Sequence, residues 1–126
     1  MQVLQLIGMK YRLGADPERH GAADCLSLSK AVLASYGIET PTPQRDWYRR
    51  LKRGDTSVFR EELSRWGEQT TSPRIGAVGL CLSDNDAKGL ATYWENGWIA
   101  FVGTRVKWSP IGALQVSAIY YPRNMR

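Results

Sequence analysis

The chain has 126 residues, of which 43% are hydrophobic and 23% charged, a composition that predicts one globular domain over residues 1–126 and excludes a disordered chain. Seventeen lysines and arginines against twelve acidic residues give a net charge of +5, which indicates either an attraction to acidic polymers, teichoic-type cell-wall polymers included, or a merely solvated surface. Two cysteines and one histidine are too few for a disulfide framework or an ordinary zinc site, so we expect no metal and no cofactor.

The N-terminal half has the spacing of helices. Residues 3–10 predict a short helix with Val3, Leu6 and Ile7 on its apolar side, and residues 11–23 predict a loop rich in glycine and charge. The clearest helix follows, with Asp24 as its N-cap and Gly37 placed to end it. The sequence also lacks a leader pattern and a membrane-spanning apolar run, so we expect synthesis in a bacterial cytoplasm without a signal peptide.

Two further helices are predicted after an extended connection over residues 38–43, which Pro41 and Pro43 keep out of the helical region. Residues 46–52 predict a basic helix. Residues 58–66 predict another, with N-caps offered by positions 55–57 and an end at Gly67.

The C-terminal half changes to the short apolar runs of strands. The sequence Glu95-Asn96-Gly97 predicts a tight hairpin, because Asn-Gly tolerates the positive φ that a primed turn needs. Helices followed by strands predict an α+β fold, with N-terminal helices packed on an antiparallel sheet of about five strands. The expected strands are residues 77–83, 90–94, 98–103, 105–108 and 115–121.

Cys25 is the strongest candidate for a chemical role. A thiol on the first turn of a helix feels the positive end of the helix dipole, which lowers its pKa and favours the reactive thiolate. The alternative is that Cys25 is a small buried apolar residue. Cys81 alternates with Leu80 and Leu82 in an apolar strand and is interpreted as part of the core.

Several motifs together resemble a known family. The pattern resembles the opening of the NlpC-type cell-wall cysteine peptidases, a bacterial and phage branch of the papain-like fold, and it weakly continues into the strands. The residues that carry the resemblance are Tyr11, Gly14, Asp24-Cys25, Leu28, Tyr36-Gly37-Ile38 and Pro41, then Gly76-Ala77-Val78-Gly79, Leu90-Ala91-Thr92-Tyr93 and Asn96-Gly97-Trp98-Ile99.

The resemblance implies an NlpC-like, papain-type domain in which Cys25 is the nucleophile and Tyr11 a supporting hydroxyl for cutting peptide or amide bonds in peptidoglycan stems. The chain departs from that pattern at three places. Leu26-Ser27 stands where the family has Ser-Gly. The general-base histidine of the family would fall at about Gly89, and the residue that orients it would fall near Ala100 or Phe101.

His20 is the one histidine that could replace the missing base. Either it folds back to form a Cys25–His20 dyad, oriented by Glu18 or Asp16, or it is an exposed histidine in a charged loop. A dyad requires the two side chains to lie about 2.6–3.2 Å apart.

A basic and aromatic stretch over residues 45–53 is a candidate binding surface, with Trp47, Arg49, Arg50 and Arg53 as its binding residues. Interleaved tryptophan and arginine can bind a polyanion or stack on sugars. The alternative is that Trp47 and Leu51 face the core and the basic residues form a solvated face.

We expect, on these grounds, a catalytically degenerate NlpC-like domain that serves as a structural or binding component, associated with a phage tail or facing the cell wall. Its expected partners are other protein subunits, of a phage tail for example, or peptidoglycan, and not nucleic acid. The alternative is an active cysteine hydrolase, a peptidoglycan endopeptidase or amidase, that uses Cys25 with His20 or with a base from a partner chain.

Overall fold

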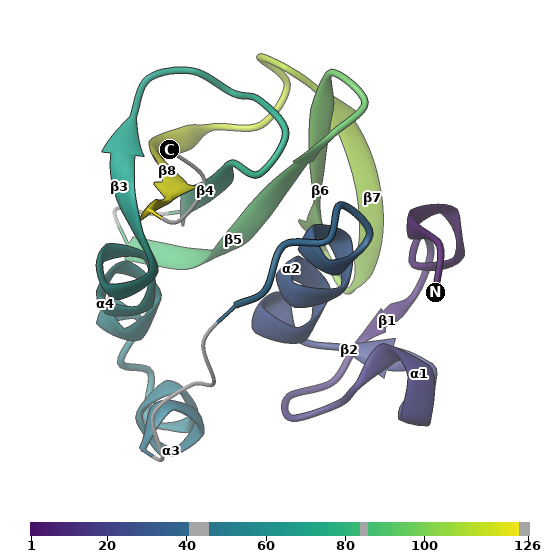
Figure 1. Cartoon of the computed structure of the whole chain (residues 1–126). Helices are drawn as coiled ribbons and strands as arrows, with labels where there is room; N and C mark the ends of the chain where they lie inside the picture. The colour runs from purple at the N-terminus through teal and green to yellow at the C-terminus, as the bar shows by residue number, and fades with distance from the viewer. Residues whose placement is uncertain (41–45, 84–85, 124–126) are drawn as a thin grey trace.

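The fold places four α-helices beside one strongly curled sheet (Figure 1). In this computed structural model, residues 1–40, 46–83 and 86–123 are described, and within them the sheet has eight strands. The predicted α+β class is confirmed. The predicted five-strand antiparallel sheet is wrong, because the eight strands form a mixed half-barrel in which one pair is parallel.

The elements alternate in type only near the N-terminus. The helices are the 3-10 helix η1 (Val3–Gln5) and the α-helices α1 (Pro17–His20), α2 (Cys25–Ala34), α3 (Trp47–Lys52) and α4 (Ser57–Trp66). The strands are β1 (Lys10–Tyr11), β2 (Ala22–Ala23), β3 (Gly67–Thr70), β4 (Val78–Ser83), β5 (Asp86–Trp94), β6 (Gly97–Val102), β7 (Arg105–Pro110) and β8 (Val116–Pro122).

The sheet has the strand order β2-β1-β7-β6-β5-β4-β8-β3. Strands β4 to β7 form an antiparallel meander, and β8 returns to pair with the free edge of β4. The register shifts next to Cys81 on both edges of β4, and such bulges increase local twist. Both irregularities thus add twist at the centre of β4.

Three strands were not predicted from the sequence, because none of them has an alternating apolar pattern. Strands β1 and β2 have two residues each and so carry no alternation that a pattern could detect, and β3 is a polar strand that starts directly at the end of α4. The expected loop over residues 11–23 also contains α1, which Asp16 caps by accepting hydrogen bonds from the N–H groups of Glu18 and Arg19 at 2.9 and 3.2 Å.

The first predicted helix is also corrected. It is reduced to the single turn of η1, and Ile7, which was assigned to the apolar side with Val3 and Leu6, is 39% exposed. Gly8 follows with a positive φ of 88° that ends any continuing helix.

Other predicted boundaries agree with the structure. Helix α2 begins at Cys25 with Asp24 as its N-cap, and Gly37 has a φ of 75° just beyond its end. The basic helix and the helix that stops at Gly67 are both present, as α3 and α4. The connection predicted at Pro41 and Pro43 lies outside the described residues.

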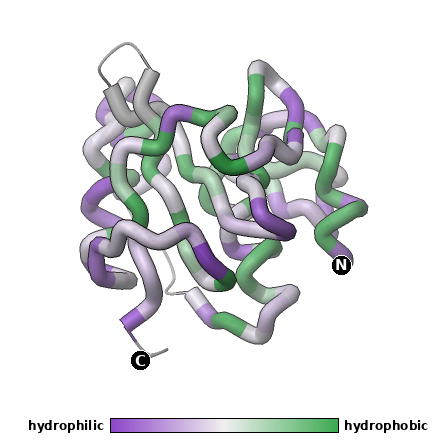
Figure 2. Tube along the Cα trace, turned by 90° about the horizontal axis from the view of Figure 1, so that it is seen from above, coloured by the Kyte–Doolittle hydropathy of each residue, from purple (hydrophilic) through white to green (hydrophobic). Residues whose placement is uncertain are grey.

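The core lies between the sheet and the helices. Helix α2 packs on the central strands β5 and β6, while α4 packs on β5, β4, β8 and β3, toward the β3 edge of the sheet (Figure 1). A separate cluster around Ala91, Trp98 and Ala100 fills the space on the other side of the strands. Hydrophobic residues recur along the N-terminal turn as well as along the central strands (Figure 2). Among the described residues, no helix has the length and apolar character needed to cross a bilayer.

Candidate functional site

The candidate site begins at the N-terminus of α2, where Asp24 and Ser27 form a reciprocal cap. The Asp24 carboxylate accepts the N–H of Ser27 at 2.8 Å, and the Ser27 hydroxyl accepts the N–H of Asp24 at 3.0 Å. The second Asp24 oxygen accepts the N–H of Gly14 at 2.9 Å, and the whole residue is buried. Ser27, where the NlpC-type pattern has glycine, therefore completes the cap that fixes the start of α2.

Cys25 follows in the first turn of α2, and its thiol is buried at the edge of β5. The ladder between β5 and β6 runs from Trp94–Gly97 to Thr92–Ile99 in the described residues and is not continued at Leu90. At that level the backbone N–H of Leu90 faces the Cys25 sulfur and favours its thiolate.

Gly89 lies directly beside this thiol. A Cβ atom at position 89 would come within 3.0 Å of Cys25 Sγ, closer than such atoms normally approach. This is the position at which the NlpC-type pattern predicts the general-base histidine. The structure therefore has bare backbone in contact with the sulfur where that family has an imidazole.

The environment of Cys25 disfavours the thiolate. Burial is the main cause that raises the pKa of the Cys25 thiol to about 11; the backbone N–H of Leu90 acts in the opposite direction, and Asp24 and Cys81 add to the rise. This pKa shift is opposite to the one expected from the helix N-terminus. The reason is that desolvation in a site only 8% exposed, beside a buried carboxylate, outweighs the dipole of the helix.

Two tyrosines from different parts of the chain converge on the same place. Tyr11 of β1 packs edge-on against Phe101 with ring centroids 5.2 Å apart, and burial raises the pKa of Tyr11 to about 12, with Cys25 and Asp24 as further causes. Tyr48 of α3 lies near Asp24, and burial together with the Asp24 carboxylate holds the pKa of Tyr48 well above its usual value. Tyr11 thus lies near enough to Cys25 for that group to raise its pKa, and its role as a supporting hydroxyl stays a prediction.

The two positions considered for an orienting polar residue differ in their surroundings. Phe101 packs against the core clusters on the side of α2, next to Tyr11, whereas Ala100 belongs to the cluster on the other side of the sheet. The side that faces Cys25 therefore holds a phenyl ring, which cannot orient an imidazole.

The structure does not join His20 to this site. His20 is the last residue of α1 and is exposed, and its Nδ1 accepts the N–H of Asp16 at 2.9 Å. This makes Asp16 a backbone partner of the ring, and the Asp16 carboxylate is used in capping α1. Glu18 pairs instead with the N-terminal amine at 3.5 Å. In the described part of the chain, no hydrogen bond connects His20 with Cys25.

The basic and aromatic stretch is divided between the core and the surface. Trp47 is 2% exposed and packs edge-on against Phe59 and Tyr48. Arg50 binds Asp55 and Glu61 and also reaches the Ser57 hydroxyl, which ties α3 to α4. The remaining cations, Arg49, Lys52 and Arg53, are exposed.

Among the cavities formed by the described residues are three that Cys25 does not line. The largest of these, about 480 Å³, is a charged cleft between α3 and α4, and another of about 380 Å³ lies between α1 and α2. A small apolar cavity of about 40 Å³ between α2 and α4 is lined by Leu26 and Leu90, the neighbours of the thiol. Within the described ranges, no group of three or more metal-ligating side chains is present.

Sequence reasoning missed two contributors to the site, Tyr48 near Asp24 and the Leu90 N–H near Cys25, which come from elements distant in sequence. Position 101 was indicated by the NlpC-type resemblance, and there the Phe101 ring packs on Tyr11. As assembled, the site can hold a neutral thiol and a capped carboxylate, but it offers no base within reach of the sulfur in the described residues. Comparisons with models of known protein families, with curated proteins and with solved structures found no match to the chain.

Proposed function

We propose that this chain is a catalytically degenerate NlpC-like domain that acts as a structural or binding component of a larger assembly. The observation that carries the proposal is the contact between Gly89 and the Cys25 thiol, because the place of a general base is taken by backbone packed against sulfur. A cysteine hydrolase needs both a thiolate and an acceptor for its proton. The raised pKa of the buried Cys25 thiol, about 11, disfavours the thiolate. The backbone at Gly89 offers no side chain that could accept the proton.

The surroundings of the thiol support the same proposal. Leu26 packs against the core cluster that contains Cys25, Phe101 packs against the same cluster, and Tyr48 closes on Asp24. A substrate carbonyl must come within about 3–3.5 Å of a nucleophile. Cys25 is only 8% exposed, which leaves little access for such an approach.

The setting we propose for this component is a phage tail or a surface that faces the bacterial cell wall, with other protein subunits or peptidoglycan as partners. This part rests on the resemblance to the NlpC-type pattern around Asp24-Cys25 and on the surplus of basic residues. An active hydrolase that relies on His20 is disfavoured, because the His20 ring accepts the N–H of Asp16.

The proposal is tested by incubating the purified protein with soluble muropeptides and analysing the products by mass spectrometry, with an active peptidase as the positive control. We expect no cleavage by the wild-type chain. The Cys25→Ser variant is the matched control, because it changes only the nucleophilic atom. Cleavage by the wild type that is lost in Cys25→Ser would show a working nucleophile and overturn the proposal.

A further inference from the structure

We propose that the exposed side of α3 formed by Arg49, Lys52 and Arg53, here called the α3 cationic face, binds an acidic segment of a partner protein. The inference rests on the proposed binding function and identifies the chemistry of its partner. It concerns a surface remote from the chemistry of Cys25, so the two proposals can fail separately.

The three cations share one side of a short helix. Positions 49, 52 and 53 are related by spacings of three and four residues, which brings their side chains together on a helical surface. All three are exposed, and none forms an ion pair with another residue of the described ranges. They form a compact positive surface with no acidic counterpart there.

Arg50 shows what a neighbouring guanidinium on the same helix binds. It lies between these cations in sequence but on the side that faces α4, where it takes the carboxylates of Asp55 and Glu61 together with the Ser57 hydroxyl. Guanidinium groups bind carboxylates through paired hydrogen bonds. The α3 cationic face presents two guanidinium groups and one ammonium group to the solvent, and a partner would supply the carboxylates that they bind.

The electrostatics of α3 favour an anionic partner. Its interior has no acidic residue, and like charges spaced three or four residues apart repel each other along a helix. The C-terminal end of the helix dipole partly offsets this repulsion. An acidic segment would relieve the remaining repulsion without moving α3.

The aromatic residues of α3 argue for a protein partner over nucleic acid. Single-stranded nucleic acids are bound largely through bases stacked on exposed aromatic rings. Trp47 is 2% exposed, and Tyr48 is directed to Asp24, so neither offers a free ring face beside the cations. Charge is then the main attraction that the surface offers, and a flexible chain of carboxylates can follow it.

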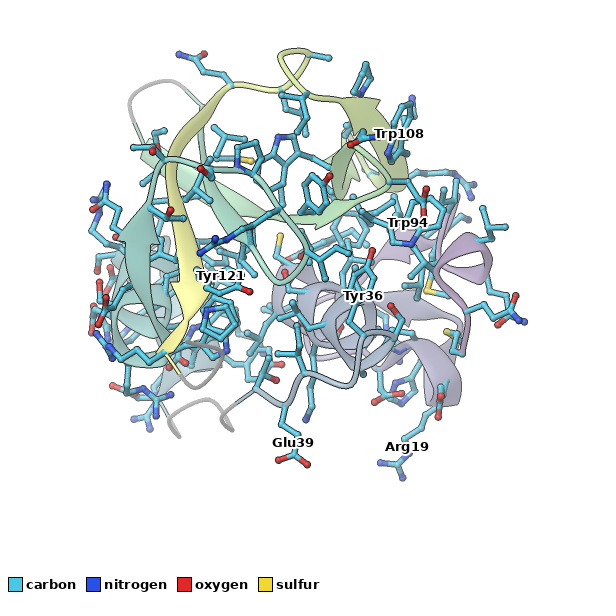
Figure 3. The ribbon with its side chains drawn as sticks, turned by 45° about the horizontal axis from the view of Figure 1, so that its top comes forward. Arg19, Tyr36, Glu39, Trp94, Trp108 and Tyr121 are labelled. Atoms are coloured by element: carbon cyan, nitrogen blue, oxygen red, sulfur yellow. The ribbon has the colours of Figure 1, made fainter. Side chains whose placement is uncertain are left out.

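The test measures binding of a fluorescein-labelled oligoglutamate peptide by fluorescence anisotropy at low and at physiological salt. Arg49→Gln/Arg53→Gln removes two charges from the α3 cationic face. The matched control is Arg19→Gln/Lys107→Gln, which removes two charges from exposed positions elsewhere; Arg19 points away from the body of the molecule (Figure 3). Thermal unfolding of both variants checks that each remains folded.

We expect the α3 variant to bind the peptide about three- to tenfold more weakly, the control to bind like the wild type, and added salt to reduce the difference. Equal losses in both variants, or no binding at low salt, would overturn the inference. Tighter binding of a thymidine single strand that depends on Arg49 and Arg53 would also overturn it, in favour of nucleic acid. None of these outcomes depends on muropeptide cleavage.

Discussion

Gly89 and Cys25 meet so closely that a methyl group at position 89 would lie 3.0 Å from the sulfur. Nonbonded heavy atoms prefer separations of about 3.5–4.0 Å, so the thiol can occupy its position only because residue 89 has no side chain. The backbone N–H of Leu90 also faces this thiol. A glycine at position 89 thus lets the sulfur lie close against β5.

The first prediction concerns Gly89→Ala. The added methyl group must displace the Cys25 sulfur or the backbone of β5, and overpacking of this kind costs about 1–3 kcal/mol. We expect the free energy of unfolding, measured by urea denaturation, to fall by that amount.

A double-mutant cycle with Cys25→Ala controls for other effects of the alanine. Once the sulfur is removed, Gly89→Ala should be neutral or stabilising, because alanine restricts the unfolded chain more than glycine does. If Gly89→Ala destabilises the wild type and the Cys25→Ala variant equally, contact with the sulfur is not the reason that alanine is unfavourable at position 89.

The second prediction concerns alkylation of Cys25. Raising the pKa of the thiol from 9.0 to about 11 lowers the thiolate fraction at neutral pH on the order of 100-fold, and burial slows reagent access further. We expect iodoacetamide to label Cys25 at least that much more slowly in the folded protein than in urea. Peptide mass spectrometry separates it from the half-buried Cys81, which should react first in the folded protein. Rapid labelling of Cys25 at neutral pH would contradict this.

The third prediction follows from the same raised pKa. Because the unfolded thiol loses its proton near pH 9 and the folded thiol near pH 11, the unfolded state is favoured as the pH rises between these values. The contribution of Cys25 to the free energy of unfolding is therefore complete below about pH 9 and is lost as the pH rises through about 11. This contribution amounts to about 2–3 kcal/mol.

We expect Cys25→Ala to remove this dependence. The difference in unfolding free energy between the wild type and the variant, measured by urea denaturation at several pH values, should shrink from about pH 8 to about pH 11. Leu33→Ala, in the same core cluster, is the control, since its effect should not vary with pH. Parallel curves for the wild type and Cys25→Ala would contradict the raised pKa.

Long elements with clear signals could be predicted from the sequence. Asp24 and Gly37 marked both ends of α2 because caps and positive-φ glycines act locally. Strand β3 could not be predicted, because its place in the sheet depends on pairing with β8, more than forty residues later in the chain. The two-residue strands β1 and β2 likewise exist only through partners far away in sequence, including β7.

The candidate site was predictable only as far as its motif extends. Cys25 at a helix start and position 89 as its neighbour followed from the pattern, and the structure brings those two positions together. The direction of the thiol pKa did not follow, because burial by Leu26, Tyr48 and Phe101 depends on tertiary packing. Arg50, expected to bind a ligand, pairs with Asp55 and Glu61, and a charge pattern alone does not reveal that pairing.

The last prediction concerns the hairpin between β5 and β6. Trp94 pairs with Gly97, so the two turn residues are Glu95 and Asn96, with φ values of 50° and 57°. The sequence pattern predicted the turn over Glu95-Asn96-Gly97, and in the structure Gly97 already belongs to β6. Next to this turn, the Trp108 indole N–H donates a hydrogen bond to the carbonyl oxygen of Trp94 at 2.9 Å (Figure 3).

Positive φ is unfavourable for glutamate and is tolerated by asparagine and glycine. We therefore expect Glu95→Gly or Glu95→Asn to raise the free energy of unfolding by about 0.5–1 kcal/mol. Asn96→Ala is the opposing control, because it places alanine at positive φ and removes the hydrogen bond from the Tyr93 hydroxyl at 3.0 Å, so it should destabilise the protein. Thermal unfolding of the three variants checks both signs. Destabilisation by Glu95→Asn would mean that the glutamate side chain contributes more to the turn than its strained backbone costs.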